Sequence, residues 1–409
     1  MTRAAGLVPA AYRPALAHRT FRRLFLGLAG SYLGDGMSFV AVAWLAIELA
    51  PQHTGLWVGA AVAAYTLPGA LGALLLGRWL RRLPAPRALL ADNVLRAVFL
   101  GAVPLLWAGG LLDPTTYVVL LAVSSLLHAW GSAATYTLLA DLMPSEHRLA
   151  ANTLVSTLTF AATIAGPAVA GVLVSSVSAS YVLGLDALSY LFLAGIIVRT
   201  SWPTAQSADP VDRAAARGGL ALLRGQPALL GLLALTWIFN LLYGPVEVAL
   251  PLHVTDDLHA SGSLLGLYWA LFGVGAVAGG LAVGALRQLP LWPVTLAIAV
   301  GWGLSLVPFG LHAPTALTVA CFTIGGAIYG PFVPLSVTLM QAESPPEHLA
   351  SMLAARSAAL LTASPLGTAL GGPITAALGP RATLGGSGLA TMALAGVAAL
   401  VLASRKGDR

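Results

Sequence analysis

The stretch FRRLFLGLAGSYLGDGMSFVAVAWLAIEL, residues 21–49, decides the fold of this chain. Arg22 and Arg23 lie at its start. A long apolar run follows, and Asp35 interrupts this run near its middle. Because a helix rises about 1.5 Å per residue, residues 24–48 are long enough to cross a hydrocarbon core of about 30 Å. The stretch therefore predicts a transmembrane helix that carries a carboxyl group near mid-membrane.

The composition of the whole chain agrees with a membrane location. Of 409 residues, 58% are hydrophobic and only 9% are charged, and the mean hydropathy is +0.84. These values exclude a soluble globular protein and indicate a polytopic membrane protein. The single cysteine, Cys321, excludes an internal disulfide and a cysteine-cluster metal site.

Further apolar runs repeat along the chain after the first one. They cover residues 56–77, 89–111, 116–140, 150–177, 181–198, 228–251, 262–286, 291–311, 314–340, 350–378 and 382–403. The only long polar connection is 199–227. The sequence thus predicts an all-α protein of twelve transmembrane helices. We expect an N-terminal six-helix bundle at 1–198, a cytoplasmic linker at 199–227 and a C-terminal six-helix bundle at 228–409.

The basic residues predict the orientation of these helices. If the N-terminus is cytoplasmic, every lysine and arginine lies on the cytoplasmic side except Arg96, Arg356 and Arg381. This bias predicts that both termini are cytoplasmic and that the chain resides in the inner, cytoplasmic membrane. It also explains the net charge of +6 without a nucleic-acid partner.

The two halves share a weak internal repeat. PSEHRLA at 144–150 follows the fourth run, and PPEHLA at 345–350 follows the tenth. Each segment precedes a long apolar run with glycine and proline, at Gly166 and Pro167 in the fifth and at 365–373 in the eleventh. A parallel repeat of six spans, related by an axis along the membrane normal, is typical of major facilitator transporters.

The chain resembles the major facilitator superfamily, and within it the drug and siderophore exporter branch that includes macrolide efflux and enterobactin export proteins. The resemblance covers nearly the whole chain. It is carried by residues 21–49, Ala91-Asp92 to Arg96-Ala97, LLADLMPSEHRLAANTL (138–154), LDALSYLFLAG (185–195), RGGLALLRGQPAL (217–229), NLLYGPVEVALPLHV (240–254) and GSLLGLYWALFGVGAVAGG (262–280). It implies proton-coupled export by alternating access, with no prosthetic cofactor and no enzymatic activity.

Two segments are candidates for gating. In the fifth run, Ala162-x3-Gly166-Pro167-x2-Ala170-Gly171 is similar to the antiporter motif G-x3-G-P-x2-G-G of the family. Such a face lets helices approach closely and bend, although it is also compatible with plain tight packing.

The second segment is the connection between the second and third runs. Arg81 stands there where exporters of the family carry an aspartate, and it is either a gating residue or a plain positive-inside topology signal. Asp92 and Arg96 are one helical turn apart and can pair, replacing part of that charge latch.

Asp35 is the leading candidate for proton coupling. A carboxylate at the membrane centre costs about 2.5 to 3.5 kcal/mol, so its presence requires a reason, and no basic residue of the same helix lies close enough to neutralise it. Glu247 follows Gly244 and Pro245, where we expect a helix break, and is a candidate for a second proton or cation site. Glu48 lies near the outer end of the first helix and is either interfacial or a coupling residue. Asp186 fits helix capping or packing as well as transport.

Other polar and aromatic residues are candidates for the substrate cavity. His128 is either a proton relay or a packing residue, and some of the aromatic residues are expected to face lipid. The candidates are Trp44, His128, Trp130, Trp237, Asn240, Tyr329 and Arg356. The remaining histidines lie in separate loops without metal-ligand spacing, so no metal site is expected.

The predicted function is proton-coupled antiport of a small amphipathic or hydrophobic compound, such as a drug or secondary metabolite. The expected partners are that substrate, protons and membrane lipid, and a monomer is expected. A lipid or lysophospholipid flippase of the same fold is the first alternative. A membrane sensor or scaffold that does not transport is the second. The sequence leaves open the identity of the substrate, import against export, and proton against sodium coupling.

Overall fold

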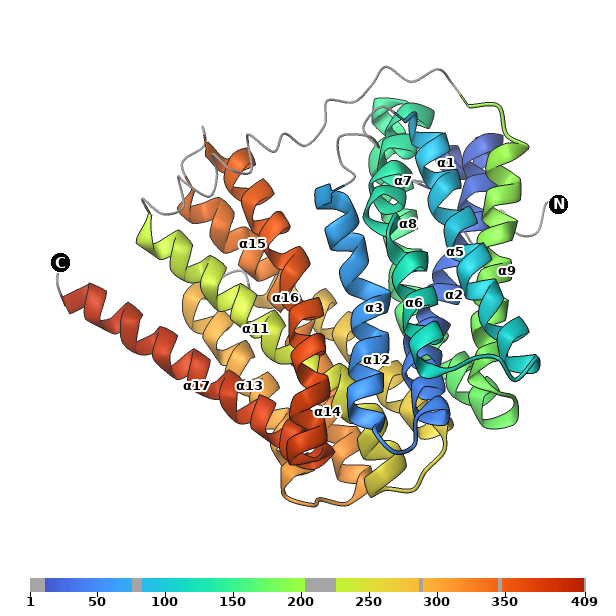
Figure 1. Cartoon of the computed structure of the whole chain (residues 1–409). Helices are drawn as coiled ribbons and strands as arrows, with labels where there is room; N and C mark the ends of the chain where they lie inside the picture. The colour runs from blue at the N-terminus through green and yellow to red at the C-terminus, as the bar shows by residue number, and fades with distance from the viewer. Residues whose placement is uncertain (1–11, 76–82, 203–225, 287–289, 345–347, 408–409) are drawn as a thin grey trace. The chain divides into compact units, whose positions relative to one another are not determined.

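The computed structural model describes residues 12–75, 83–202, 226–286, 290–344 and 348–407. All elements of the described residues are helices, joined by short turns (Figure 1). The elements are α1 (Arg13–Ala17), α2 (Arg19–Leu49), α3 (Thr54–Leu75), α5 (Ala85–Ala108), α6 (Pro114–Ser125), α7 (His128–Leu142), α8 (Ser145–Ser176), α9 (Ala179–Val198), α11 (Pro227–Leu252), the π-helical turn η3 (His253–Asp257), α12 (Gly262–Leu286), α13 (Leu291–Gly310), α14 (Thr315–Tyr329), α15 (Phe332–Glu343), α16 (Leu349–Leu378) and α17 (Pro380–Gly407). The all-α prediction is confirmed.

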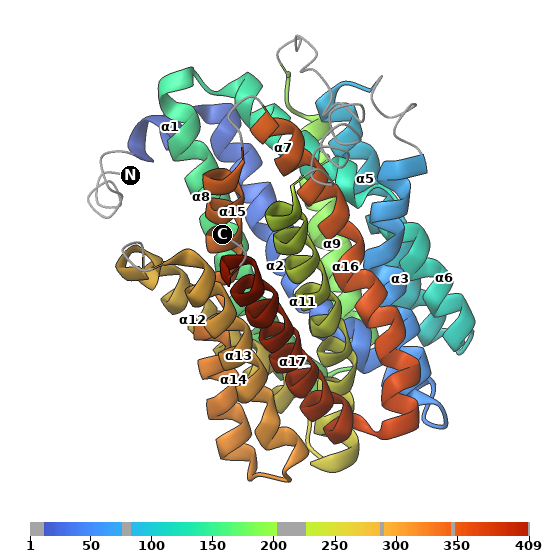
Figure 2. The same ribbon diagram turned by 90° about the vertical axis from the view of Figure 1, so that its left-hand side faces the viewer.

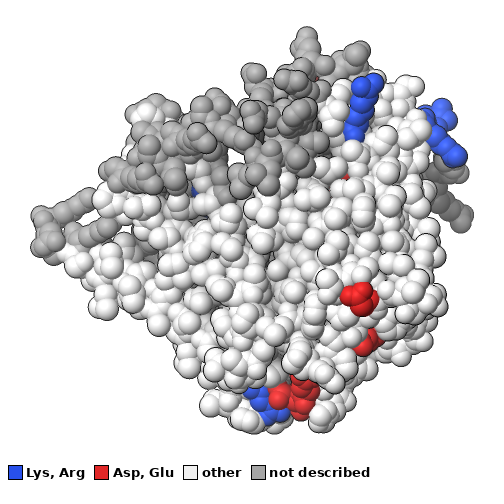
Figure 3. All heavy atoms as spheres, viewed as in Figure 1, with Lys and Arg blue, Asp and Glu red and all other residues white. Residues whose placement is uncertain are grey.

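Eleven of the spans in the described residues are long and apolar enough to cross a membrane. The remaining predicted span, 350–378, corresponds to α16, which has membrane-spanning length at 30 residues but is rich in alanine, serine, threonine and glycine. Charged side chains are few on the face drawn in Figure 3, as a polytopic membrane protein requires.

The chain forms two compact units. Unit 1 contains residues 1–45 and 64–208, and unit 2 contains residues 46–63 and 209–409. The first part of α3 belongs to unit 2 because it packs against α16. A Cβ atom added at Gly59 would lie 2.5 Å from the Cα of Gly372, so these two backbones meet directly. Within unit 2, α11 lies beside both α16 and α17 (Figure 2).

The helix ends follow local sequence signals. Asp113 caps α6, and its Oδ1 accepts hydrogen bonds from the backbone N–H groups of Thr115 (2.9 Å) and Thr116 (3.2 Å). Pro114 then occupies the first helical turn, where its missing N–H costs nothing. Gly379 ends α16 with φ of 82°, a backbone conformation that glycine adopts without strain.

Two predicted spans are broken into two helices each. The fourth predicted span divides into α6 and α7 at Leu126 and Leu127, and the tenth divides into α14 and α15 at Gly330 and Pro331. The two breaks occur in corresponding spans of the two halves, although in the register of the repeat they lie about one helical turn apart. Discontinuous helices in corresponding spans are a recurrent feature of transporters built from repeats.

The helix break expected near Gly244 and Pro245 is wrong. Helix α11 continues through both residues to Leu252, and a π-helical turn follows, closed by the Leu258 N–H donating to the His253 carbonyl at 3.1 Å. A proline removes only one backbone hydrogen bond, and a neighbouring helix can hold the chain in place. Here α16 does so, since a Cβ atom at Gly244 would lie 2.3 Å from the Gly367 backbone.

Candidate functional site

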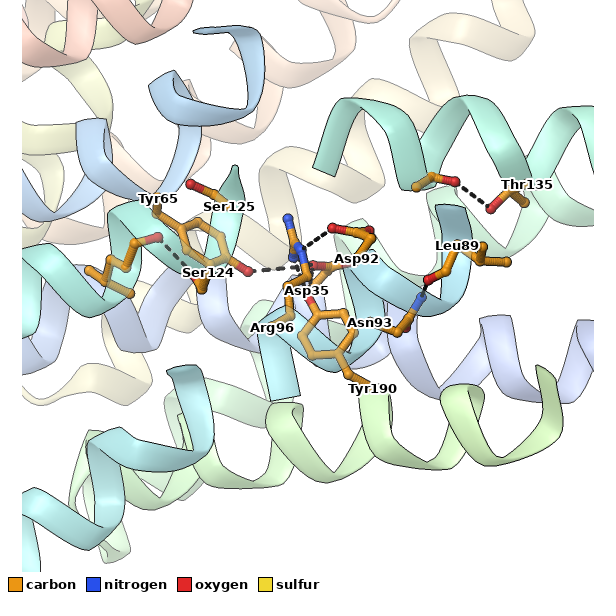
Figure 4. A network of polar contacts seen from close by, with 12 residues as sticks. Asp35, Tyr65, Leu89, Asp92, Asn93, Arg96, Ser124, Ser125, Thr135 and Tyr190 are labelled. Atoms are coloured by element: carbon orange, nitrogen blue, oxygen red, sulfur yellow. Dashed lines mark hydrogen bonds and ion pairs between the residues drawn. The ribbon is translucent and has the colours of Figure 1, made fainter. Parts of the chain in front are cut away.

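An ion pair between two helices forms the centre of the site in unit 1. Asp35 projects from α2 and Arg96 from α5, and Arg96 Nη1 lies 2.9 Å from Asp35 Oδ1 (Figure 4). The Arg96 side chain is 2% exposed, whereas the Asp35 side chain is 30% exposed. The positive charge is therefore enclosed by protein, and the carboxylate forms the accessible end of the pair.

Two tyrosines complete the surroundings of this pair. The Tyr190 hydroxyl of α9 donates a hydrogen bond to Asp35 and accepts one from Arg96, so it bridges the two charges. The Tyr65 hydroxyl of α3 donates to Asp35 Oδ1 at 3.4 Å. The guanidinium carbon of Arg96 lies 5.1 Å from the Tyr190 ring centroid and 5.6 Å from that of Tyr65, within the range of cation–π attraction. Side chains from the three helices α2, α3 and α9 thus surround one arginine of α5.

Two further carboxyl groups lie close to this arginine. Asp92 Oδ1 is 3.5 Å from Arg96 Nε, one turn earlier on α5. Asp186 of α9 is fully buried and accepts hydrogen bonds from Ser38 Oγ (2.5 Å) and Ser189 Oγ (3.2 Å). Unit 1 therefore gathers three carboxyl groups near one arginine; Asp92 and Asp186 are buried, and Asp35 is the accessible one.

A second acidic residue, Glu247, lies in unit 2 on α11. Its Oε2 accepts a hydrogen bond from Thr368 Oγ1 of α16 at 2.8 Å. Tyr329 of α14 stands near it and belongs to a large group of packed aromatic rings. Of the predicted acidic residues, Asp35 thus has an arginine partner, whereas Glu247 lies beside aromatic rings.

The predicted gating residues lie at a close helix contact within unit 1. A Cβ atom added at Gly166 of α8 would lie 2.4 Å from the Gly36 carbonyl carbon of α2, next to Asp35. Pro167 lies inside the continuous helix α8, and Gly171 is buried. Arg81 lies outside the described residues.

The other predicted site residues are spread over both units. Glu48 is exposed near the end of α2, Trp44 is half-buried on the same helix, and His128 is exposed at the start of α7. Trp130 is half-buried, and its Nε1 is enclosed without a hydrogen-bond acceptor among the described residues.

Three further candidates belong to unit 2. Trp237 Nε1 donates to Thr362 Oγ1 at 3.2 Å, and Asn240 Nδ2 donates to the Thr236 carbonyl at 2.8 Å. Arg356 is 7% exposed and donates to Ser336 Oγ at 2.6 Å.

Sequence reasoning missed several contributors to these sites. Tyr190 follows Asp186 by four residues on one helix, so helical spacing alone could have placed both on the same face. Tyr65 had no such signal, because it occurs in an apolar run and approaches Asp35 only through packing. Asp92 and Arg96 were expected to pair with each other, and the structure adds that Arg96 also pairs with Asp35.

Comparisons with known proteins agree on one family. The family model of the Major Facilitator Superfamily matches residues 24–286 and 241–409. An uncharacterized MFS-type transporter of Sinorhizobium fredii is 27% identical over 317 residues, which cover 75% of this chain and 77% of that protein. The multidrug efflux pump Tap of Mycolicibacterium fortuitum is 26% identical over 352 residues, covering 82% of this chain and 84% of that protein.

Solved structures show the same fold. The nucleoside transporter NupG has a TM-score of 0.72 at 16% identity, covering 93% of this chain and 99% of that chain. A bacterial homolog of the human lysosomal transporter Spinster, in an inward-facing and unoccupied conformation, has a TM-score of 0.71 at 13% identity, covering 95% and 97%. Together with the family match over most of the sequence, these likenesses lead to one conclusion: the chain belongs to the major facilitator superfamily of membrane transporters.

Proposed function

We propose that this protein is a proton-coupled antiporter that exports small amphipathic or hydrophobic compounds by alternating access. The observation that carries the proposal is the Asp35–Arg96 ion pair, which joins α2 to α5 in the interior of unit 1 and leaves only the carboxylate accessible. The name of the Mycolicibacterium fortuitum relative, a multidrug efflux pump, supports export and a broad substrate class.

Proton exchange at Asp35 changes the charge balance of the whole network. With all groups ionised, Asp35, Asp92 and Asp186 place three negative charges around the single positive charge of Arg96. An uncompensated charge in a dry interior is costly, so a proton bound by one carboxyl group relieves the excess. Protonation of Asp35 removes its negative charge and so weakens its ion pair with Arg96 and its hydrogen bond with Tyr190. The contacts between α2, α5 and α9 can then rearrange.

The close contact of Gly36 with Gly166 would link protonation of Asp35 to a movement of α2 against α8. Gly36 follows Asp35 directly on α2, and its backbone touches α8 at Gly166. A change at Asp35 therefore acts on a helix surface that is smooth enough to slide. Each proton that moves inward contributes about 2.3 kcal/mol per 100 mV of membrane potential.

The proposal includes a location in the cytoplasmic membrane, with both termini in the cytoplasm, and a monomeric state. The positive-inside bias of the arginines supports this orientation.

Transport into liposomes tests the function. Purified protein is reconstituted, a proton gradient is imposed, and the flux of lipophilic cations and macrolide-like compounds is compared between wild type and Asp35→Asn. Asp256→Asn serves as the matched control, because Asp256 is an exposed aspartate in η3. We expect gradient-driven flux in wild type and in the control, and loss of its gradient dependence in Asp35→Asn. Equal responses of wild type and Asp35→Asn, or movement of lipid but of none of these compounds, would contradict the proposal.

A further inference from the structure

We propose that Glu247, Tyr243 and Tyr329 form a binding site in unit 2 for the positively charged group of an amphipathic organic cation. The site lies within one unit and consists of residues from α11 and α14, with α16 supporting the carboxylate. The inference rests on the proposed export function, because it names the chemical class that the exporter would carry.

A packed group of rings forms one side of this site. We call it the aromatic wall; it consists of Tyr243, Trp269, Phe272, Trp302 and Tyr329. The ring centroid of Tyr243 lies 5.3 Å from that of Tyr329, 5.7 Å from that of Trp302, 6.4 Å from that of Phe272 and 6.5 Å from that of Trp269. These separations are those of interlocked aromatic pairs, so the wall is a rigid surface.

The exposure of the wall is uneven. Trp302 is fully buried, and Trp269 and Phe272 are buried as well. Tyr243 and Tyr329 are only half-buried and therefore form the accessible edge. Neither tyrosine hydroxyl has a hydrogen-bond partner among the residues that the structure describes. The buried rings thus support two accessible ones whose polar ends remain available.

Glu247 lies beside this accessible edge. It follows Tyr243 by one helical turn on α11, and its carboxylate is close enough to both Tyr243 and Tyr329 to interact with them electrostatically. Its side chain is half-buried, and Thr368 donates the one hydrogen bond recorded for it. In the described part of the chain, no lysine, arginine or histidine lies within ion-pairing distance of Glu247. A carboxylate, two ring faces and an accessible surface therefore occur together without a counter-ion.

The contrast with Asp35 indicates what completes the site. Asp35 has Arg96 at 2.9 Å, so its negative charge is balanced within the protein. A half-buried carboxylate inside a membrane span is costly unless it faces a water-filled space or a positive partner. Among the described residues of unit 2, Glu247 has no such partner. A bound cation would supply one, and the neighbouring rings select its chemistry.

The rings favour a bulky organic cation. Aromatic faces attract cations whose charge is spread over carbon, such as quaternary ammonium groups, and a hydrated metal ion gains less from the same surface. A ligand that carries aromatic or aliphatic groups around its charge would cover Tyr243 and Tyr329 while it neutralises Glu247. Binding is then decided by charge sign and apolar surface, and requires few directional hydrogen bonds.

Two ions of nearly equal size and opposite charge test the assignment. The full-length protein in lipid nanodiscs, without any proton gradient, is titrated with tetraphenylphosphonium and with tetraphenylborate, and binding above that of empty nanodiscs is measured. We expect the wild type to bind the cation at least about tenfold more tightly than Glu247→Gln does, a difference of about 1.4 kcal/mol. Binding of the anion should not be weakened by Glu247→Gln.

Matched variants separate the site from general effects. Glu343→Gln is the control for Glu247→Gln, because Glu343 is an exposed glutamate of α15 outside the aromatic wall. Tyr243→Phe keeps the ring and should bind the cation within about twofold of wild type, whereas Tyr243→Leu should weaken binding about fivefold. If Glu247→Gln does not fold, Glu247→Asp and the two Tyr243 variants decide the question.

The outcomes distinguish this site from the proposed function. Equal cation affinity in wild type and Glu247→Gln, or equal affinity in Tyr243→Phe and Tyr243→Leu, would overturn the binding site. Because no gradient is applied, those results leave proton-driven export by Asp35 untouched. Glu247-dependent cation binding without any gradient-driven flux would support the site and contradict the export function alone.

Discussion

Arg96 Nη1 of α5 lies 2.9 Å from Asp35 Oδ1 of α2, and this contact gives Asp35 a counter-ion that no nearby residue of its own helix supplies. The Tyr190 hydroxyl bridges the same two side chains. An aspartate in the middle of an apolar helix is therefore stabilised by a partner 61 positions further along the chain. The consequences of this pairing can be tested separately from transport.

Removal of Arg96 alone should cost more than removal of both members of the ion pair. Arg96→Gln leaves Asp35 and Asp92 beside a neutral group, and breaking a buried pair in this way destabilises by about 3 to 5 kcal/mol. In the double variant Asp35→Asn, Arg96→Gln, one of these unbalanced charges is removed as well, so stability should partly recover. Thermal unfolding of the four proteins in detergent gives the coupling free energy. Strictly additive effects would show that the two residues do not interact.

The two tyrosines should differ in their effect on the same pair. Tyr190→Phe removes a hydroxyl that contacts both charges, so we expect a loss of about 1 to 3 kcal/mol. Tyr65→Phe removes one long contact of 3.4 Å and should change the stability by less than about 1 kcal/mol. The same unfolding measurement compares them. A larger loss in Tyr65→Phe than in Tyr190→Phe would contradict the geometry of the site.

The contact of α2 with α8 should tolerate no added side chain. Gly166→Ala places a methyl group 2.4 Å from the Gly36 backbone, so the helices must separate. We expect lower stability, by about 1 to 3 kcal/mol, together with impaired transport. Gly195→Ala is the control, because no atom lies within 4 Å of a Cβ added there and alanine favours the helix. If both variants behave alike, the close contact is not important.

Asp113, the N-cap residue of α6, lies just outside the membrane-spanning residues and should make the stability of the folded protein depend on pH. Hydrogen bonds from the Thr116 hydroxyl and backbone, and from the Thr115 backbone, lower the pKa of Asp113 below its ordinary value. A lowered folded-state pKa means that the cap contributes fully above the unfolded value of about 3.9 and loses its contribution as the pH falls through the folded value.

Asp113→Ala should therefore melt at a lower temperature than wild type near neutral pH, and the two proteins should converge once the pH has fallen below the lowered folded-state pKa of Asp113. Melting temperatures measured across this range in detergent check the prediction. Asp256→Asn, an exposed aspartate outside the cap, should not show this convergence. A difference between wild type and Asp113→Ala that persists at low pH would contradict the assigned cap.

The break in the fourth predicted span is a feature that the sequence does not predict. In the tenth span the break coincides with Gly330 and Pro331, which are recognisable in the sequence. In the fourth span it occurs at Leu126 and Leu127, which carry no such signal. The expected break at Pro245 is absent for the converse reason, since packing of Gly244 against α16 keeps α11 continuous.

The sequence by itself determined the all-helical membrane fold and the position of Asp35 in the middle of a span. Those features depend on the length and apolar character of each run, which hydropathy records directly. Only the tertiary structure decided that Arg96, Tyr190 and Tyr65 surround Asp35, and that Glu247 lies against the aromatic wall. Which side chains meet between helices depends on the rotation and close packing of each helix, and in a nearly uniform apolar sequence the hydrophobic pattern does not specify that rotation.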